Sequence, residues 1–95
     1  MPMLLIRQRV SDYAAWKRAF ADQAHARTAN GCQGVQIFRN PDDPNETIVI
    51  LAWDSLVRAR LYSKSDELLE SLDQPGVADR PDLWLLEEIG DGPTA

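Results

Sequence analysis

The chain is 95 residues long and carries a net charge of −5, with a sequence pI of about 4.6. A chain of this length forms one domain, which buries roughly 65% of the surface that the unfolded chain exposes. Its hydrophobic fraction of 44% is ordinary for a globular protein and disfavours disorder. The acidic charge disfavours nucleic acid as a partner, because phosphate binding relies on clustered Lys and Arg, and the ten basic residues are scattered along this chain.

Membrane and export signals are not recognisable in the sequence. No stretch reaches the ~18 apolar residues that a membrane span needs. The opening MPMLLIRQRV is too short and too soon charged for a signal peptide. Cys32 is the single cysteine, so an internal disulfide is excluded. These features predict a cytoplasmic protein with no membrane partner.

A strand and a long helix are predicted at the start of the chain. Residues 3–10 are rich in β-formers and partly alternate, which predicts the first strand. Ser11 and Asp12 then favour a helix start, as an N-cap and as a negative charge in the first turn. Asn30-Gly31 ends the helix, because glycine adopts the left-handed cap conformation without steric cost. Positions with helical spacing form one apolar stripe, which also takes in a basic residue near the helix end: Tyr13, Trp16, Phe20, Ala24 and Arg27.

A hairpin, further helices and a last strand follow. Residues 32–40 and 47–54 predict two strands joined by the turn PDDPNE at 41–46. Asp54 or Ser55 would cap the next helix, and Ser65 would begin another that runs to Gln74. Two stretches complete the chain, a strand at 83–89 and a tail at 90–95.

This order of elements, β-α-β-β-α-(α)-β, is that of the split βαβ or ferredoxin-like fold. It predicts an α+β protein with a four-stranded antiparallel sheet and helices on one face of it. The single domain covers residues 1–89.

The third predicted strand is apolar on both of its faces. Ile48, Ile50 and Ala52 point to one side, and Val49, Leu51 and Trp53 point to the other. Helices can cover only one side, and an uncovered apolar patch of this kind marks an interaction site. We interpret the face with Val49, Leu51 and Trp53 as the interface of a homodimer, because two identical sheets can close face to face around a two-fold axis.

Three segments together resemble the dimeric α/β-barrel superfamily, and within it the antibiotic-biosynthesis-monooxygenase-like proteins. They are VSDYAAWKRAF, GCQGVQIFRNPDDPNETIVILAWDS and SKSDELLESLDQPGV, and the resemblance spans roughly residues 3 to 89. It implies a dimeric α/β barrel with a cavity for a small organic ligand. It also implies two enzyme classes, cofactor-independent oxygenases and haem-degrading enzymes, beside members with no established activity.

The resemblance suggests which residues would bind a substrate. The oxygenases place an Asn, a Trp and sometimes an Arg around an aromatic substrate. Trp53 matches the tryptophan, whereas the first strand offers Arg7, Gln8 and Arg9 in place of the asparagine. Haem-degrading members use a histidine on the helix after the hairpin, and this chain has none there. No cofactor is therefore expected.

The substrate-binding residues predicted from this are Trp53, Arg7 and Arg9, which would line one shared space. Trp53 would be a flat wall for an aromatic ligand, or simply part of the interface core. Leu4 and Ile6 should meet the helices, which sends Arg7 and Arg9 to the other side of the sheet. There the two arginines would orient an anionic substrate, or form structural ion pairs with carboxylates such as Glu87 and Glu88 or with those of a partner. Gln8 breaks the alternation and is the other cavity candidate.

Other reactive side chains carry less weight, and no catalytic residue is assigned. His25 lies off the apolar stripe, on the solvent side of the helix. Cys32 is expected to be a small buried hydrophobe. One His and one Cys cannot form a zinc site, and the acidic residues of the turn at 41–46 lack EF-hand spacing, so no metal is expected.

Two functions remain open at this point. One is a cofactor-independent monooxygenase-like enzyme that acts on a small aromatic or anionic substrate. The other is a non-catalytic binding or assembly module. RNA recognition through the sheet ranks last, because the first strand has no aromatic residue and the chain is acidic.

Overall fold

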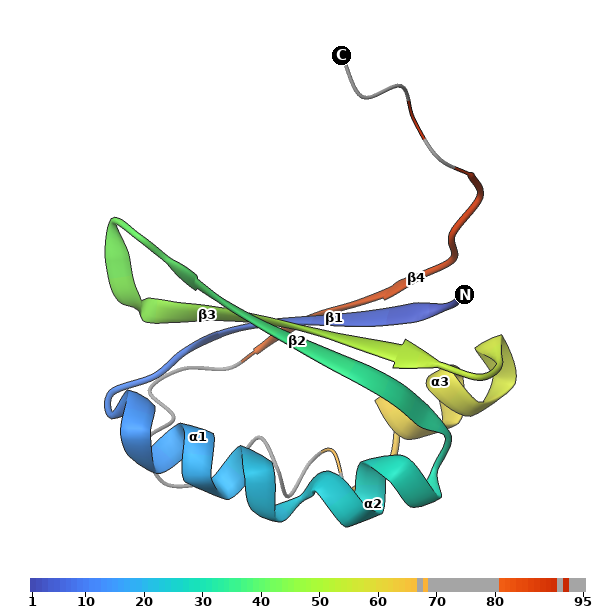
Figure 1. Ribbon diagram of the computed structural model, residues 1–95, viewed down its shortest axis with the longest axis horizontal. Coiled ribbons are helices and arrows are strands. Elements are labelled where there is room, and N and C mark those ends of the chain that lie inside the picture. Colours follow the sequence, from blue (N-terminus) through green and yellow to red (C-terminus); the bar gives the residue numbers. More distant parts are fainter. Residues whose placement is uncertain (67, 69–80, 91, 93–95) are drawn as a thin grey trace.

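The computed structural model describes residues 1–66, 68, 81–90 and 92. In chain order the elements are β1 (Met3–Arg9), α1 (Tyr13–Asp22), α2 (Ala24–Ala29), β2 (Cys32–Asn40), β3 (Asp43–Trp53), α3 (Leu56–Ser63) and β4 (Asp82–Leu86). The four strands form one antiparallel sheet in the order β2-β3-β1-β4, and the helices lie on one face of it (Figure 1). This is the ferredoxin-like α+β fold that the order of elements predicted. Among the described residues, no helix is long and apolar enough to cross a membrane.

The predicted long helix is divided in two at Gln23. The N–H of Gln23 donates to the carbonyl of Phe20 at 3.2 Å, and Gln23 takes φ −91° and ψ 3°, outside the α-helical region. The tightened turn ends α1, and α2 begins at the next residue. The start of α1 also differs by one position, because Asp12 itself is the N-cap and accepts the N–H of Ala15 at 3.1 Å.

The hairpin turn is shorter than predicted, because β3 begins at Asp43. Asn40 closes the turn with its side-chain oxygen, which accepts the N–H of Asp42 at 2.9 Å. Pro44 is tolerated because the pairing of β2 with β3 is already irregular between Arg39 and Asn40, where a missing N–H costs little.

Two helix starts are confirmed after the hairpin. Ser55 caps α3 and accepts the N–H of Arg58 at 3.2 Å, and Ser65 accepts the N–H of Leu68 at the same distance. The continuation of that last helix to Gln74 lies outside the described residues, as does most of the predicted tail at 90–95. The final strand begins one residue earlier than predicted and ends at Leu86.

The core lies between the sheet and the helices, and it contains the residues that we had assigned to a dimer interface. Leu4 pairs with Leu51 in the register of β1 and β3, and both are fully buried. Directly opposed residues of antiparallel strands point to the same face. Leu4 was correctly predicted to meet the helices, so the predicted direction of Val49, Leu51 and Trp53 is wrong, and these three side chains face the helices as well.

The other side of the sheet carries Ile48, Ile50 and Ala52, and the described residues leave it uncovered. We call it the open face. The open face is strongly apolar, and the side chains of Phe38, Trp84 and Leu86 are each more than 40% exposed on it. The apolar side chains of the open face include Leu5, Phe38, Ile48, Ile50, Ala52, Trp84 and Leu86.

The aromatic stripe of α1 packs against the core as a row of rings. Trp16 is buried, and its ring lies 5.8 Å from that of Tyr13 and 5.4 Å from that of Phe20, between centroids. Tyr13 and Phe20 are only partly buried, although the apolar stripe of the sequence indicates burial of all three rings.

The link between α2 and β2 depends on Gly31, and this yields a stability prediction. Gly31 has a φ of +105°, and a Cβ there would lie 2.7 Å from Asp54 Oδ1 and 2.9 Å from Arg58 Nε. That carboxylate and guanidinium form an ion pair at 2.8 Å, and Arg58 also donates to the carbonyl of Ala29 at 3.0 Å. We expect Gly31→Ala to lower the free energy of unfolding by about 2 kcal/mol, from backbone strain and from the displaced pair.

Chemical denaturation would measure this loss, with Gly34→Ala as the matched control. A Cβ at Gly34 meets no atom within 4 Å and requires no positive φ. The control should therefore stay close to the parent protein. Equal losses in the two variants would contradict a specific role for Gly31.

Candidate ligand-binding site

The structure does not bring the three predicted site residues together. Trp53 is fully buried on the helix side of the sheet. Arg7 and Arg9 lie on the open face, since they pair across β3 with Ile48 and Glu46. Alternation along the strands therefore places the two arginines on one face of the sheet and the tryptophan on the other. The prediction that the three residues line one shared space is wrong.

Arg7 and Arg9 are instead engaged in ion pairs with carboxylates of neighbouring strands. Arg7 binds Glu46 at 3.2 Å and Asp82 at 3.1 Å, and Arg9 binds Asp43 at 2.6 Å. The hydrogen bond and charge of Glu46 raise the pKa of Arg7, and the hydrogen bond from Arg9 lowers the pKa of Asp43. The structural ion-pair alternative is thus supported, with partners other than the predicted Glu87 and Glu88. Exposed pairs of this kind contribute little to stability.

Trp53 lies in the core between the sheet and the helices. Its ring centroid is 4.8 Å from that of Tyr62 on α3. Its indole Nε1 is buried and has no hydrogen-bond partner among the described residues. Cys32 is its cross-strand partner, so the two side chains share the helix side of the sheet.

Arg27 is a buried cation on this side of the sheet. It is only 4% exposed, and its guanidinium carbon lies 3.8 Å from the centroid of the Phe20 ring. Neither Nε nor Nη1 has a hydrogen-bond partner among the described residues, and burial lowers the pKa of the group. The sequence placed Arg27 on the apolar stripe. Its position on the apolar stripe is the feature of the sequence that distinguishes Arg27 from the other basic residues and indicates its burial.

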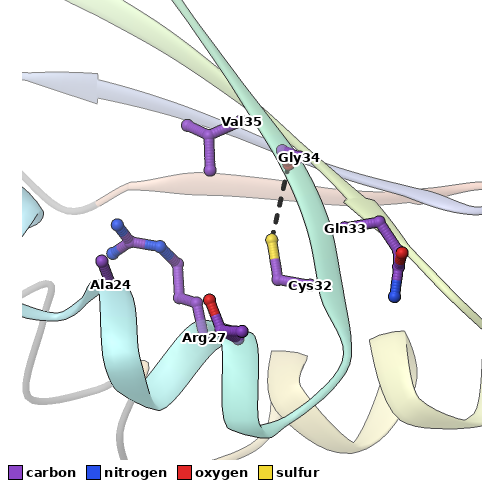
Figure 2. Close-up of a pocket in the computed structure, with 7 residues that line it drawn as sticks. Ala24, Arg27, Cys32, Gln33, Gly34 and Val35 are labelled. Carbon is purple, nitrogen blue, oxygen red and sulfur yellow. Dashed lines mark hydrogen bonds between the residues drawn. The ribbon is translucent and has the colours of Figure 1, made fainter.

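A cavity of about 140 Å³ opens beside Arg27, between α2 and β2. Ala24, Arg27 and Thr28 line it from the helix, and residues 32–35 line it from the strand. In Figure 2 the side chain of Arg27 rises from α2 into the space below Val35, and Cys32 faces it from the strand. Cys32 is partly exposed rather than buried as expected, and its thiol is 3.4 Å from the carbonyl oxygen of Gly34.

Gln8 occupies the other end of the same side of the sheet. Its Oε1 accepts the indole N–H of Trp16 at 3.2 Å, while its Nε2 is buried without a partner among the described residues. The break in alternation that Gln8 causes in the sequence thus corresponds to a polar group directed toward the helices.

The buried polar atoms without partners have one property in common. Within the described part of the chain there are four, and all are nitrogens that donate: Gln8 Nε2, Arg27 Nε, Arg27 Nη1 and Trp53 Nε1. An unsatisfied buried donor costs about 1–3 kcal/mol, so each is expensive to keep. A set of donors on one side of the sheet is complementary to a ligand that carries acceptor oxygens.

Metal and acid–base chemistry find little support among the described residues. No group of three or more His, Cys, Asp or Glu side chains gathers there to hold a metal ion. His25 is exposed, as its position off the apolar stripe predicted. The described lining of the cavity includes no carboxylate and no histidine. The site therefore supplies donors and positive charge rather than a base.

Several solved structures share this fold, and the similarity covers nearly the whole chain. A point mutant of SnoaB, a cofactor-independent oxygenase from Streptomyces nogalater, superimposes with a TM-score of 0.75 at 17% identity, covering 97% of this chain and 96% of its own. An antibiotic biosynthesis monooxygenase-like protein from Bordetella bronchiseptica gives a TM-score of 0.75 at 16% identity, with 93% and 96% covered. Another from Caulobacter crescentus gives 0.73 at 19% identity, with 94% and 90% covered. At such identities the likeness shows the fold.

The sequence carries the family assignment. A comparison with proteins of curated function gives no match. The family model for antibiotic biosynthesis monooxygenases matches residues 12–74, which is more than half of the chain. The matched region runs from the N-cap of α1 past the hairpin and α3. The chain therefore belongs to the antibiotic biosynthesis monooxygenase family.

Proposed function

We propose that this protein is a cofactor-independent oxygenase that acts on a small aromatic molecule held between the sheet and the helices. The observation that carries the proposal is the set of buried N–H donors without partners on the helix side of the sheet. A bound aromatic molecule with hydroxyl or carbonyl oxygens would satisfy those of Arg27 and Trp53, whereas Gln8 lies at the other end of the sheet. The fold shared with SnoaB, a cofactor-independent oxygenase, supports this choice of reaction.

Without a cofactor, the electrons for oxygen must come from the substrate. A phenol can supply them once its hydroxyl proton is released: one ring carbon exchanges its hydrogen for an oxygen atom in a new C–O bond, and the phenol becomes a quinone. The second oxygen atom leaves as water with that hydrogen and the hydroxyl proton, so the reaction balances. Donors aimed at the substrate oxygen would stabilise the negative charge that persists through the electron transfer.

Of the three substrate-binding residues predicted from the sequence, we assign Trp53 the role of donor to the substrate oxygen. Its Nε1 would donate to a substrate oxygen, and its ring, held against Tyr62, would form the deep wall of the site. The open-face positions of Arg7 and Arg9 would serve only a ligand bound on that face, and both guanidinium groups already bind carboxylates.

A non-catalytic binding module is the second candidate. It is favoured by one observation, the lack of any carboxylate or histidine in the described lining of the cavity. A binding protein needs donors and shape, whereas a catalyst must also handle a proton. The two candidates differ in whether oxygen is consumed.

We further propose that two copies associate through their open faces in the cytoplasm, as a dimeric α/β barrel. The open face presents several large apolar side chains, and each exposed one forfeits roughly 1.5–3 kcal/mol of burial. A second copy offers an identical apolar sheet that can cover it under a two-fold axis. The ion pairs of Arg7 and Arg9 would form the polar margin of that interface.

Neighbouring residues of β3 allow a sharp test of the dimer. Ile50 lies on the open face and Leu51 lies in the core. We expect Ile50→Lys to give a folded monomer near 10.7 kDa, because a charge then faces the partner sheet. Leu51→Lys should instead lower the free energy of unfolding by about 4 kcal/mol, because the lysine enters the core.

Light scattering would give the mass of the parent and of each variant, and circular dichroism would report folding. A parent protein that is monomeric at micromolar concentration would contradict the dimer. So would an Ile50→Lys variant that keeps the mass of the parent.

The oxygenase is tested with single-ring phenols under ¹⁸O₂, with no metal, flavin or nicotinamide added. We expect labelled oxygen in the quinone product and in water, with kcat reduced about 10²-fold by Trp53→Phe, which keeps a ring and removes the N–H donor. Trp84→Phe is the matched control, because Trp84 lies on the open face. Binding of the phenols without any oxygen uptake would favour the non-catalytic module.

A further inference from the structure

We infer that Arg27 anchors an anionic oxygen, a carboxylate or phenolate, of a single-ring ligand in the cavity between α2 and β2. The inference rests on the proposed function in one respect, that the ligand lies on the helix side of the sheet. It adds the charge and size of the ligand and a binding residue that neither the sequence prediction nor the family match provides.

Arg27 is a buried cation without a counter-ion among the described residues. The described ion pairs involve Arg7, Arg9, Arg58 and the N-terminal amine, and none involves Arg27. A buried charge is ordinarily paired, because it has lost the solvation of water. The Phe20 ring offsets part of that loss through a cation–π contact. The remaining requirement is an anion that this part of the protein does not supply.

The direction of the side chain says where the anion would bind. Arg27 is one of the cavity-lining residues, and its guanidinium extends into the space between the start of α2 and Val35 (Figure 2). Phe20 holds the group on one side of its plane. Nε and Nη1 remain as donors in that plane, and charged, planar donors of this kind suit carboxylate and phenolate oxygens.

The size of the cavity limits the ligand. The volume is about 140 Å³, and a cavity of roughly 150 Å³ is known to hold a benzene molecule. One six-membered ring with a small anionic substituent therefore fills the cavity. Thr28 adds a hydroxyl group to the lining, which suits a ligand with more than one oxygen.

Cys32 provides a built-in reporter of occupancy. It is the single cysteine of the chain, it lines the same cavity, and it is partly exposed. A ligand that fills the cavity should slow its alkylation by iodoacetamide. This readout needs no catalytic activity, so it is independent of the oxygenase proposal.

The test compares benzoate with benzamide, which has nearly the same shape and no charge. In the parent protein, benzoate should protect Cys32 at concentrations about tenfold lower than benzamide, because a charge-assisted hydrogen bond is roughly twice as strong as a neutral one. Arg27→Gln should abolish the preference, and Arg27→Lys should retain part of it. Arg18→Gln, at an exposed position of α1, should leave it unchanged.

The outcomes separate the two proposals. Equal protection by the two compounds in the parent protein, or no protection by either, would overturn the role of Arg27, and this comparison stands even if Arg27→Gln does not fold. A preference for benzoate that survives in folded Arg27→Gln would overturn it too. A preference that depends on Arg27, together with no oxygen uptake from any phenol, would support the anion site and reject the oxygenase.

Discussion

The pairing of β1 with β3 is the constraint on which the rest of the structure depends. Leu4 opposes Leu51 in this register, and strict alternation then decides the direction of every other side chain in the two strands. One set of residues faces the helices and forms the core. The other set forms the open face. A shift of the register by one residue would exchange the two faces of one strand relative to the other, so that either Leu51 would leave the core or Arg7 would enter it. The buried side chains of Leu4 and Leu51 make that exchange costly, so the register and the core stabilise each other.

The helix side of the sheet combines stability with features that stability does not require. Trp16 and Phe20 stack and cover the sheet, and the ring of Phe20 makes a cation–π contact with the guanidinium of Arg27. An apolar side chain at position 27 would fill this place without the desolvation of a charge. The same holds for Trp53, whose indole nitrogen is buried without a partner in the described part of the chain. Polar groups that weaken a core are most easily understood as ligand contacts, because a bound acceptor returns the hydrogen bonds that folding removed.

The two sides of the sheet therefore differ in how charge is treated. On the open face, each arginine of β1 binds a carboxylate of an adjacent strand, and these pairs stay in contact with water. On the helix side, Arg27 has no such partner among the described residues and is removed from water. Charge on the open face is neutralised within the chain, and the apolar side chains there are available for another sheet. The charge of Arg27 on the helix side lacks a partner in the described part of the chain and is therefore available to a bound anion.

Local sequence determined much of this protein by itself. The order of elements, the caps at Asp12 and Ser55, and the glycine that ends α2 follow from short-range chemistry, and they are sufficient to specify the ferredoxin-like topology. The direction of β3 was decided only by the tertiary structure. Its two faces are equally apolar, so the alternation of residues does not indicate which face is buried. The pairing of β3 with β1 decides this. The burial of Arg27 was likewise decided by packing, because a charged residue on an apolar stripe becomes buried only when an aromatic ring and a neighbouring strand enclose it.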